Sequence, residues 1–570
     1  MKDWRHVVNG LAIPCESGYA DQPSLVKAWN GAWVCSVTTG HGSEGAQGQY
    51  VNITRSFDKG RTWTKPVSIE PDGWESAYSS LAVAPSGRIY CFYCHNLHHI
   101  DIRDAGLGRY DMGGEYCFRV SADNGSTWSK RYIATIRDMG IDARQEERFK
   151  SFDGKPLRFF WNVSRIWFDG DTFYSPIIKY IYKPRDVIHT SQGVLLRCAG
   201  LDAGYMDGFA NVKWETLPDG EEGICTPEGG GRVAEEQSYV TLSDGTLFCA
   251  FRTIDGHPAG AASLDSGRVF EPPQYLRRLE GRLLKHNRAA TFIWPLGENR
   301  YFYWFNNQGE KWFQRRNPVW CAIGVEVPGK TGLTVEFGQP EILLYHADPR
   351  VGSSYPDLLK DGATWYITET EKRNARLHPI DNTFLDTMLR AVDGTLTIDE
   401  APAWRSSEIP ASDLNFPAMP FLSANPRENT IGYTLLMDVD GASPGDPLFQ
   451  AGNANGGITV RLDGSGKPTA IISEEMANCA IEGSANVGDG KPHRLAVQLD
   501  VSANIGWFVI DGSTDDGGEG VCGWRFLNSA LQVVPGGPAE LGRRCQAASL
   551  YARCLMDAEA AVLTSPACAN

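Results

Sequence analysis

The octapeptide SFDKGRTW at residues 56–63 recurs as SADNGSTW at residues 121–128. Both copies read S-x-D-x-G-x-T-W, and a more divergent third copy, SLDSGRVF at residues 263–270, keeps the Ser, the Asp, the Gly and an aromatic residue in register. Each copy lies between two apolar, strand-like runs, where a hairpin turn is expected. In such a turn the Asp can accept backbone N–H bonds, the Gly can adopt a positive φ, and the Trp can pack against a neighbouring unit.

The spacing of the three copies predicts a repeat architecture. They begin 65 and 142 residues apart, and the second interval is about twice the first. A period of this length suits a four-stranded unit with long loops, and such units close into a ring because none buries its faces alone. The motif resembles the Asp-box, or BNR repeat, of the sialidase (neuraminidase)-like β-propellers. The resemblance implies an all-β fold, with a six-bladed sialidase-like propeller over residues 1–402.

The sequence changes character after residue 402. Prolines punctuate a linker at Pro402, Pro410, Pro417 and Pro420. Alternating strands with Gly/Asp turns follow, and the phrase DGKPH at residues 489–493 resembles laminin-G or concanavalin-like jelly rolls. We therefore expect a β-sandwich (jelly-roll) domain over residues 403–570, which would brace the propeller or bind glycan. We favour bracing.

Charge and hydropathy exclude some partners. The 570-residue chain has 69 Asp and Glu against 54 Lys and Arg, which gives a net charge of −15 and a pI near 5.3. This balance argues against nucleic acid or an anionic membrane as a partner. It leaves an acidic oligosaccharide or glycoconjugate possible, because a few Arg residues in a pocket can bind a carboxylate. No run of about 18 apolar residues exists, so no membrane span is expected.

The cysteines and the N-terminus bear on cofactors and compartment. Fourteen scattered cysteines form no disulfide framework, and no apolar signal segment opens the chain. We expect a cytoplasmic protein as the sequence stands, or a secreted or periplasmic one whose signal has been removed. The string Cys91-x-x-Cys94-His95 matches a haem attachment motif, but it lies in an aromatic strand and has no second Cys pair for zinc. No cofactor and no metal are expected.

The start of the propeller departs most from the sialidase pattern. Sialidases carry an Arg here, just before an apolar residue and a Pro, whereas residues 19–25 read YADQPSL and place Asp21 in this region. The following Gly-rich loop, residues 38–49, corresponds to the one that bears the acid/base Asp of the family. It offers Glu44 and His41 instead. Asp21 and the missing Arg argue against an ordinary sialidase.

Other segments resemble the rest of the sialidase site. Two strands joined by a Ser-Asp-Gly turn bring Glu236 and Arg252 to the same end of a hairpin, and the resemblance makes them the base and a carboxylate-binding Arg. By the same resemblance, Arg316 matches the next Arg, with Arg288 or Arg315 as alternatives. In SSYPDLL, residues 353–359, Tyr355 holds the position of the nucleophile.

This set of residues suits an acidic sugar. A neutral phenol avoids the repulsion that a carboxylate nucleophile would meet beside a substrate carboxylate, and Glu236 would take its proton. Arg pairs would orient the acid group, and Glu44 or His41 would protonate the leaving oxygen. We therefore expect an exo-acting retaining glycosidase that releases a terminal sialic or other ulosonic acid.

Two other classes stay open. A uronate-specific polysaccharide lyase, acting for example on rhamnosyl-glucuronate, would use a Tyr and a His with an Arg, and four residues could supply that set: His41, His95, Tyr355 and Arg252. His95 ends a strand and could face the central pocket. A non-catalytic glycan-binding propeller is the third class, and the missing Arg gives it some weight.

Overall fold

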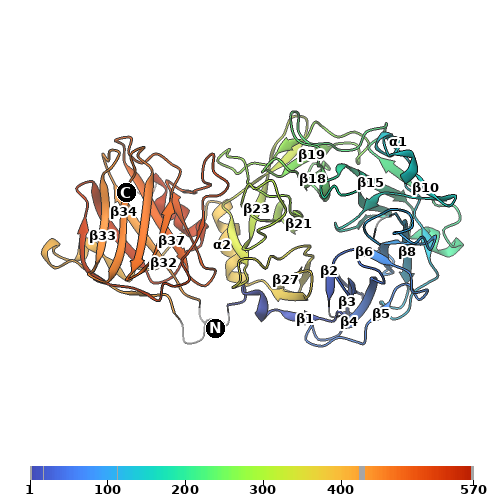
Figure 1. The fold of residues 1–570 in the computed structure, drawn as a ribbon, viewed down its shortest axis with the longest axis horizontal. Coiled ribbons are helices and arrows are strands. Elements are labelled where there is room, and N and C mark those ends of the chain that lie inside the picture. Colours follow the sequence, from blue (N-terminus) through green and yellow to red (C-terminus); the bar gives the residue numbers. More distant parts are fainter. Residues whose placement is uncertain (1–2, 17, 112, 423–429, 567–570) are drawn as a thin grey trace.

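Six antiparallel sheets form a ring in the computed structural model, and a two-layer sandwich stands beside them (Figure 1). The structure describes residues 3–16, 18–111, 113–422 and 430–566. Each sheet of the ring has four or five strands and is one blade of a β-propeller. The predicted fold class, an all-β chain with a propeller, is confirmed, and the number of blades and the type of the C-terminal domain stay predictions. The domain boundary between residues 402 and 403 stays a prediction.

The blades follow one another along the chain. The first blade contains β2 (Tyr19–Lys27), β3 (Trp33–Gly40), β4 (Tyr50–Ser56) and β5 (Val67–Ser68). The second contains β6 (Ser76–Val83), β7 (Ile89–His95), β8 (Glu115–Ser121) and β9 (Tyr132–Ile133). The third contains β12 (Phe160–Trp161), β13 (Trp167–Asp169), β14 (Thr172–Ile181), β15 (Thr190–Ala199) and β16 (Glu215–Leu217). The fourth blade contains β17 (Glu235–Thr241), β18 (Leu247–Arg252), β19 (Ala259–Ser263) and β20 (Gln274–Tyr275). The fifth contains β21 (Phe292–Gly297), β22 (Arg300–Phe305), β23 (Val319–Pro328), β24 (Leu333–Phe337) and β25 (Glu341–Leu344).

The sixth blade closes the ring. It contains β26 (Leu358–Asp361), β27 (Thr364–Thr370) and β28 (Ala375–Pro379), and its outermost strand is β1 (Leu11–Ile13) from the start of the chain. Leu11 pairs with Leu377, and Ile13 pairs with Ala375. The two ends of the propeller sequence therefore share one sheet, and this shared sheet closes the ring.

The repeated octapeptides form three turns of the same geometry, each between the third and fourth strands of a blade. In the first, the Thr62 backbone N–H donates to Asp58 Oδ1 at 2.8 Å, the Gly60 N–H donates to Ser56 Oγ at 2.8 Å, and Gly60 has a φ of +81°. The other two turns repeat these bonds with Asp123 and Asp265. The Asp and Gly therefore have the structural roles that the sequence predicts for them.

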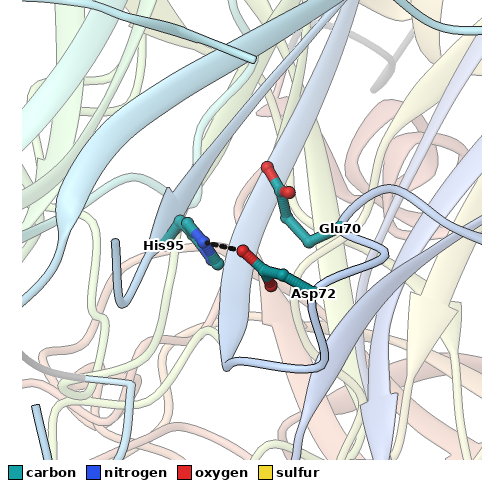
Figure 2. Close-up of side chains that lie close together, drawn as sticks. All are labelled: Glu70, Asp72 and His95. Atoms are coloured by element: carbon teal, nitrogen blue, oxygen red, sulfur yellow. Dashed lines mark hydrogen bonds and ion pairs between the residues drawn. The ribbon is translucent and has the colours of Figure 1, made fainter. Parts of the chain in front are cut away.

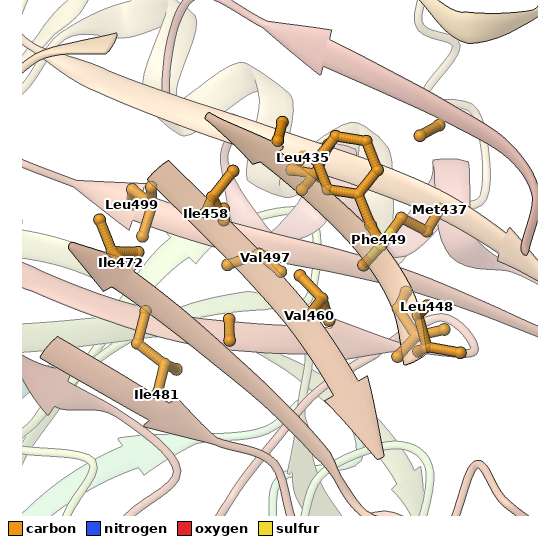
Figure 3. Packing of buried hydrophobic residues seen from close by; sticks show 14 of the residues in the cluster. Leu435, Met437, Leu448, Phe449, Ile458, Val460, Ile472, Ile481, Val497 and Leu499 are labelled. Atoms are coloured by element: carbon orange, nitrogen blue, oxygen red, sulfur yellow. The ribbon is translucent and has the colours of Figure 1, made fainter. Parts of the chain in front are cut away.

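The sandwich has two main sheets around one apolar core (Figure 3). One sheet contains β29 (Trp404–Arg405), β32 (Gly432–Val439), β37 (His493–Asp500), β38 (Ile505–Ile510), β39 (Ser513–Thr514), β40 (Arg525–Phe526) and β43 (Cys545–Tyr551). The other contains β30 (Asn415–Phe416), β33 (Pro447–Asn453), β34 (Gly456–Leu462), β35 (Pro468–Glu474), β36 (Ala477–Glu482) and β42 (Gly537–Leu541), while β31 (Met419–Pro420) pairs with β41 (Val533–Val534). Alternate residues such as Ile458 and Val460 point into this core.

Helices are few and short. They are α1 (Gly140–Ala143), α2 (Asn382–Val392) and α3 (Asp557–Thr564), with five 3₁₀ turns at Val7–Asn9, Glu147–Phe149, Ala203–Asp207, Ser406–Glu408 and Ala411–Asp413. A small hairpin of β10 (Ser151–Phe152) and β11 (Lys155–Pro156) lies in the long loop after the second blade. None of the described helices is long and apolar enough to cross a membrane. All thirteen described cysteines are free thiols.

Propeller and sandwich share an apolar interface. Trp320 of β23 packs edge-to-face against Trp507 of β38, with ring centroids 5.8 Å apart. Glu341 of β25 accepts hydrogen bonds from the backbone N–H groups of Asp557 and Ala558, at 3.0 and 2.7 Å, at the start of α3. These contacts fix the sandwich against the fourth and fifth blades.

Candidate active site

The innermost strands of several blades are kinked at one residue. Gln22 in β2, Tyr78 in β6 and Glu236 in β17 lie at register shifts and have φ values of +52°, +59° and +62°. Tyr355, just before β26, has a φ of +47°. Side chains other than Gly rarely adopt this conformation, and each instance costs about 1–3 kcal/mol unless the surroundings enforce it. Strained residues of this kind cluster at functional sites, and Tyr78, Glu236 and Tyr355 line the same cleft.

This central cleft has a volume of about 1230 Å³. Among the described residues that line it, ten are Arg or Lys and six are Asp or Glu. A chain with a net charge of −15 therefore has a cleft with an excess of cations. Such a cleft favours an anionic ligand.

Tyr355 and Glu236 are in contact at the base of the cleft. The Tyr355 hydroxyl lies 3.4 Å from Glu236 Oε1, and the Trp161 indole N–H donates to the same oxygen at 3.3 Å. Both residues are buried, at 7% and 1% exposure. Burial raises the pKa of Glu236, against the opposing effect of Arg252, and burial also raises the pKa of Tyr355. Glu236 is therefore a stronger base than an exposed Glu, and it is placed to accept the phenolic proton.

Two of the predicted Arg residues are already neutralised by carboxylates. Arg252 pairs with Glu235 at 2.7 Å and with Glu236 at 2.8 Å. Arg288 pairs with the fully buried Glu235 at 2.8 Å, and Ser191 donates to Glu235 as well. Although burial opposes ionisation, Arg288 and Arg252 lower the pKa of Glu235. The four charged groups balance, so they form a rigid ion-pair network at the rim of the Tyr355 site.

Arg316 is held by neutral groups instead. Its Nη1 donates to Ser354 Oγ at 2.6 Å, its Nε donates to the Phe313 carbonyl at 2.9 Å, and its guanidinium lies 5.8 Å from the Tyr355 ring centroid. No Asp or Glu in the described ranges forms an ion pair with Arg316. The loop before it is fastened by Asn287, whose amide donates to the Gln314 carbonyl at 2.6 Å.

The sandwich supports this loop from the other side. Lys285 Nζ donates to the Gly518 carbonyl at 2.6 Å, Gly309 N–H donates to the Val521 carbonyl at 2.6 Å, and Trp524 Nε1 donates to the Asn307 carbonyl at 3.0 Å. Residues 518–524 of the sandwich thus contact both segments that lead to Arg288 and Arg316. This arrangement agrees with a bracing role.

The loop between β3 and β4 brings Glu44 to the cleft but leaves His41 outside it. Glu44 pairs with Arg109 at 2.8 Å and with Lys372 at 3.2 Å. Burial opposes ionisation of Glu44, but Lys372 and Arg109 outweigh it and lower the pKa well below the ordinary value. Glu44 is therefore ionised before a ligand binds. The His41 side chain is 84% exposed, faces Glu16 at 3.9 Å and is not among the lining residues.

Asp21 and His95 do not reach the cleft either. Asp21 is 1% exposed and accepts hydrogen bonds from the Tyr19 hydroxyl at 2.8 Å and from Lys372 Nζ at 2.7 Å. It therefore acts as a partner of Lys372 behind the cleft surface. The His95 side chain is buried within the second blade. Its imidazole Nε2 lies 3.2 Å from Asp72 Oδ2, and Glu70 lies close to both.

The cluster of Glu70, Asp72 and His95 has side chains of metal-ligand type (Figure 2). The Arg131 guanidinium occupies its centre, however, since its Nη1 lies 2.9 Å from Glu70, 3.0 Å from Asp72 and 2.8 Å from His95 Nε2. Arg119 also pairs with Glu70 at 2.8 Å. The fixed cations make this cluster an ion-pair network of the blade.

Some residues of the cleft escaped the sequence analysis. They are Lys372, Tyr78, Arg109 and Asp111, and the last three form one hydrogen-bonded group beside Glu44. Glu235, buried behind the cleft, was also missed. Lys372 follows the strand run TWYITET, so its place at a strand end next to acidic residues was a usable signal. Arg109 and Asp111 lie in a long loop whose sequence has no such pattern.

Comparisons with known proteins gave structural similarities only. No protein-family model matches the sequence, and no curated protein matches it. A Hadza microbial sialidase is 16% identical, with a TM-score of 0.44, over 64% of this chain and 66% of that one. The chain therefore spans just under two thirds of the length of that protein. The Trypanosoma rangeli sialidase in complex with sialic acid is 12% identical, with a TM-score of 0.40, over 97% of this chain and 94% of that one. The Ruminococcus gnavus intramolecular trans-sialidase in complex with oseltamivir carboxylate is 13% identical, with a TM-score of 0.43, over 66% and 97%.

Proposed function

We propose that the protein is a retaining exo-glycosidase that releases a terminal acidic sugar, a sialic or other ulosonic acid, with Tyr355 as nucleophile and Glu236 as its base. The observation that carries the proposal is the 3.4 Å contact between the two buried side chains in a cleft with excess cations. A phenol beside a general base is a recognised activated nucleophile. A cation-rich wall would hold the carboxylate of the substrate next to the reacting carbon.

The first step would form a bond between the Tyr355 oxygen and the anomeric carbon, while Glu236 takes the phenolic proton and the bond to the leaving oxygen breaks. Water would then attack the anomeric carbon and lose a proton to the ionised Glu44, while the bond to the Tyr355 oxygen breaks and Glu236 returns its proton to that oxygen. The Arg252 guanidinium, 2.8 Å from Glu236 Oε2, would orient the base. Each proton transfer of this kind contributes about 100- to 10,000-fold to the rate.

The leaving oxygen also needs a proton or another electrophile. Glu44 is the predicted donor that lines the cleft, but its ion pairs with Arg109 and Lys372 keep it ionised. A phenol-like leaving group, which needs little protonation, would therefore be released much faster than an alkyl alcohol. For natural glycosides, the bound substrate must first separate Glu44 from its cations.

The lyase alternative has less support. It used His41 or His95, and neither lines the cleft. The contact between Tyr355 and Glu236 also favours transfer of the phenolic proton to Glu236 over the use of Tyr355 with a His partner.

The test is a panel of aryl glycosides of a sialic acid, a second ulosonic acid and glucuronic acid, assayed with wild-type protein and Tyr355→Phe. We expect aryl release from at least one ulosonic acid and a loss of about 100-fold or more in Tyr355→Phe. Ultraviolet absorbance of an unsaturated uronate, measured on a glucuronate-containing oligosaccharide, would identify a lyase. Binding of the sugars without any release would identify a glycan-binding propeller.

A further inference from the structure

We propose that Lys372 and Arg316 form the anion-binding pair of the central cleft, and that Asp21 tethers Lys372 rather than repelling the substrate. The inference rests on the proposed function for the identity of the ligand, an acidic sugar bound at Tyr355. It assigns the carboxylate to two cations that flank the Tyr355 ring, in place of Arg252 and Arg288.

The charge distribution excludes Arg252 and Arg288 as the pair that binds the carboxylate. Arg252 and Arg288 share the two carboxylates of Glu235 and Glu236, and all four side chains are buried. A substrate carboxylate placed there would compete with partners already 2.7–2.8 Å away. Pulling either Arg from them would leave a buried charge without its partner, which is strongly unfavourable.

Arg316 has the free capacity that Arg252 lacks. A guanidinium has five N–H donors, and the bonds of Arg316 described above go to one hydroxyl and one carbonyl. Neither partner carries a charge, so the cation is not neutralised within the described residues. Arg316 lines the cleft and lies 5.8 Å from the Tyr355 ring centroid.

Lys372 lies beside the same Tyr355 ring. Its Nζ lies 4.2 Å from the Tyr355 ring centroid, and it also lines the cleft. Two of the three ammonium protons face Asp21 Oδ2 at 2.7 Å and Glu44 at 3.2 Å, which leaves one donor for a ligand. The backbone is held as well, because Lys372 has a φ of +66° and its N–H donates to Thr370 Oγ1 at 2.9 Å.

Asp21 accounts for this placement. The strand that opens the propeller has an acid where the sialidase pattern has an Arg, and the opposite charge comes from residue 372 just after β27. Asp21 is 1% exposed, its Oδ2 accepts from both Lys372 and Tyr19, and it does not line the cleft. The first blade thus supplies an acid in this region, and the sixth blade supplies the cation that pairs with it.

The use of one Lys and one Arg as the anion-binding pair has a consequence for specificity. An ammonium is a compact point charge, whereas a guanidinium presents a planar fork that matches a carboxylate in two bonds. A site built from one Arg and one Lys therefore constrains the orientation of the acid group less than three Arg residues would. It accepts acidic sugars whose carboxylate is oriented differently at the reacting carbon.

The test is calorimetric binding of N-acetylneuraminic acid and of glucuronic acid, each beside its uncharged methyl ester. We expect wild-type protein to prefer at least one acid over its ester. Lys372→Met should weaken binding of that acid about tenfold or more and leave binding of the ester unchanged, because it removes one charge-assisted bond. Lys372→Arg should retain the preference. Lys65→Met, at an exposed Lys outside the cleft, is the matched control and should bind as wild type.

Equal weakening of acid and ester in Lys372→Met, or unchanged acid binding, would overturn the inference, and so would a wild-type protein without preference for either acid. Asp21→Asn adds an arm that keeps Lys372 charged: acid binding should stay equal or weaken, because the tether is loosened, and acid binding about tenfold tighter would show that Asp21 repels the substrate and would contradict the tether. If wild-type protein cleaves no glycoside but shows the Lys372-dependent preference, the proposed function fails and the inference stands. If it cleaves acidic glycosides and Lys372→Met keeps the preference, the inference fails alone.

Discussion

The Tyr355 hydroxyl lies 3.4 Å from Glu236 Oε1, although 119 residues separate them in the sequence. Glu236 belongs to the fourth blade and Tyr355 to the sixth, so only closure of the ring brings them together. Both have a positive φ, and both are buried beside Arg252 or Arg316. The pair is therefore a property of the whole propeller.

Replacing the base should reduce activity without unfolding the protein. Glu236→Gln keeps the shape of the side chain but cannot accept the phenolic proton, so kcat on an acidic aryl glycoside should fall about 100- to 10,000-fold. The circular dichroism spectrum should match wild type. A kcat within about threefold of the wild-type value would show that Tyr355 does not need Glu236 as its base.

The activity should rise with pH through the ionisation of Glu236. Because burial raises the pKa of this carboxyl above 4.5, the acidic limb of the profile of kcat/KM should have its midpoint above that value. Only the ionised form accepts a proton, so activity is lost as the pH falls through the midpoint. A limb that persists unchanged in Glu236→Gln would assign it to another group.

Removing the buried carboxylate that joins two Arg residues should destabilise the propeller. Glu235→Ala leaves Arg252 and Arg288 without their shared partner, and breaking a buried pair costs about 3–5 kcal/mol. Denaturant unfolding measures the change. Glu147→Ala removes an exposed pair with Lys150 and should stay within about 1 kcal/mol of wild type. Equal effects of the two variants would contradict the neutralised network.

The contact between propeller and sandwich should weaken as the pH rises. Burial raises the pKa of Asp557 from 3.8 to about 7, and Glu341 beside it also has a raised pKa because it is buried next to Asp557. Between 3.8 and about 7 the folded protein keeps a proton on Asp557 that the unfolded chain has released, so the free energy of unfolding falls as the pH rises through this window. Melting temperatures at about pH 5 and about pH 8 should therefore differ, with the lower value at about pH 8.

The matched variant is Asp557→Asn. The amide does not titrate, and it can still accept a hydrogen bond from the Trp507 indole, which donates to Asp557 Oδ1 at 2.7 Å. We expect a smaller difference in melting temperature between the two pH values. A variant with the full wild-type difference would assign the pH dependence to other groups.

The repeated turns made the fold accessible from sequence, because the Ser, Asp and Gly of residues 56–63 make the same bonds wherever they recur. The hairpin predicted that Glu236 and Arg252 would lie at one end, and the resemblance to sialidases added Tyr355 and Arg316. All four line the cleft. Their roles stay a proposal.

Other features depend on geometry that the sequence does not display. Glu235 and Glu236 are neighbours, and alternation would put them on opposite faces of a strand, but the register shift after Glu235 lets both reach Arg252. The same limit applied to His95, since the direction of its ring depends on Arg131 and Asp72 from other segments. Lys372 had a usable signal in its position after a strand, but its pairing with Asp21, 351 residues away, could not be read from the sequence.

The central claim is that Tyr355 attacks the anomeric carbon of an acidic sugar. The most direct measurement is peptide mass spectrometry of protein denatured during turnover of an acidic aryl glycoside. The account predicts a mass increase of one glycosyl residue on the peptide that contains Tyr355, absent in Tyr355→Phe. A protein that turns over the glycoside with the glycosyl group on another residue, or with inversion and no covalent species, would contradict it.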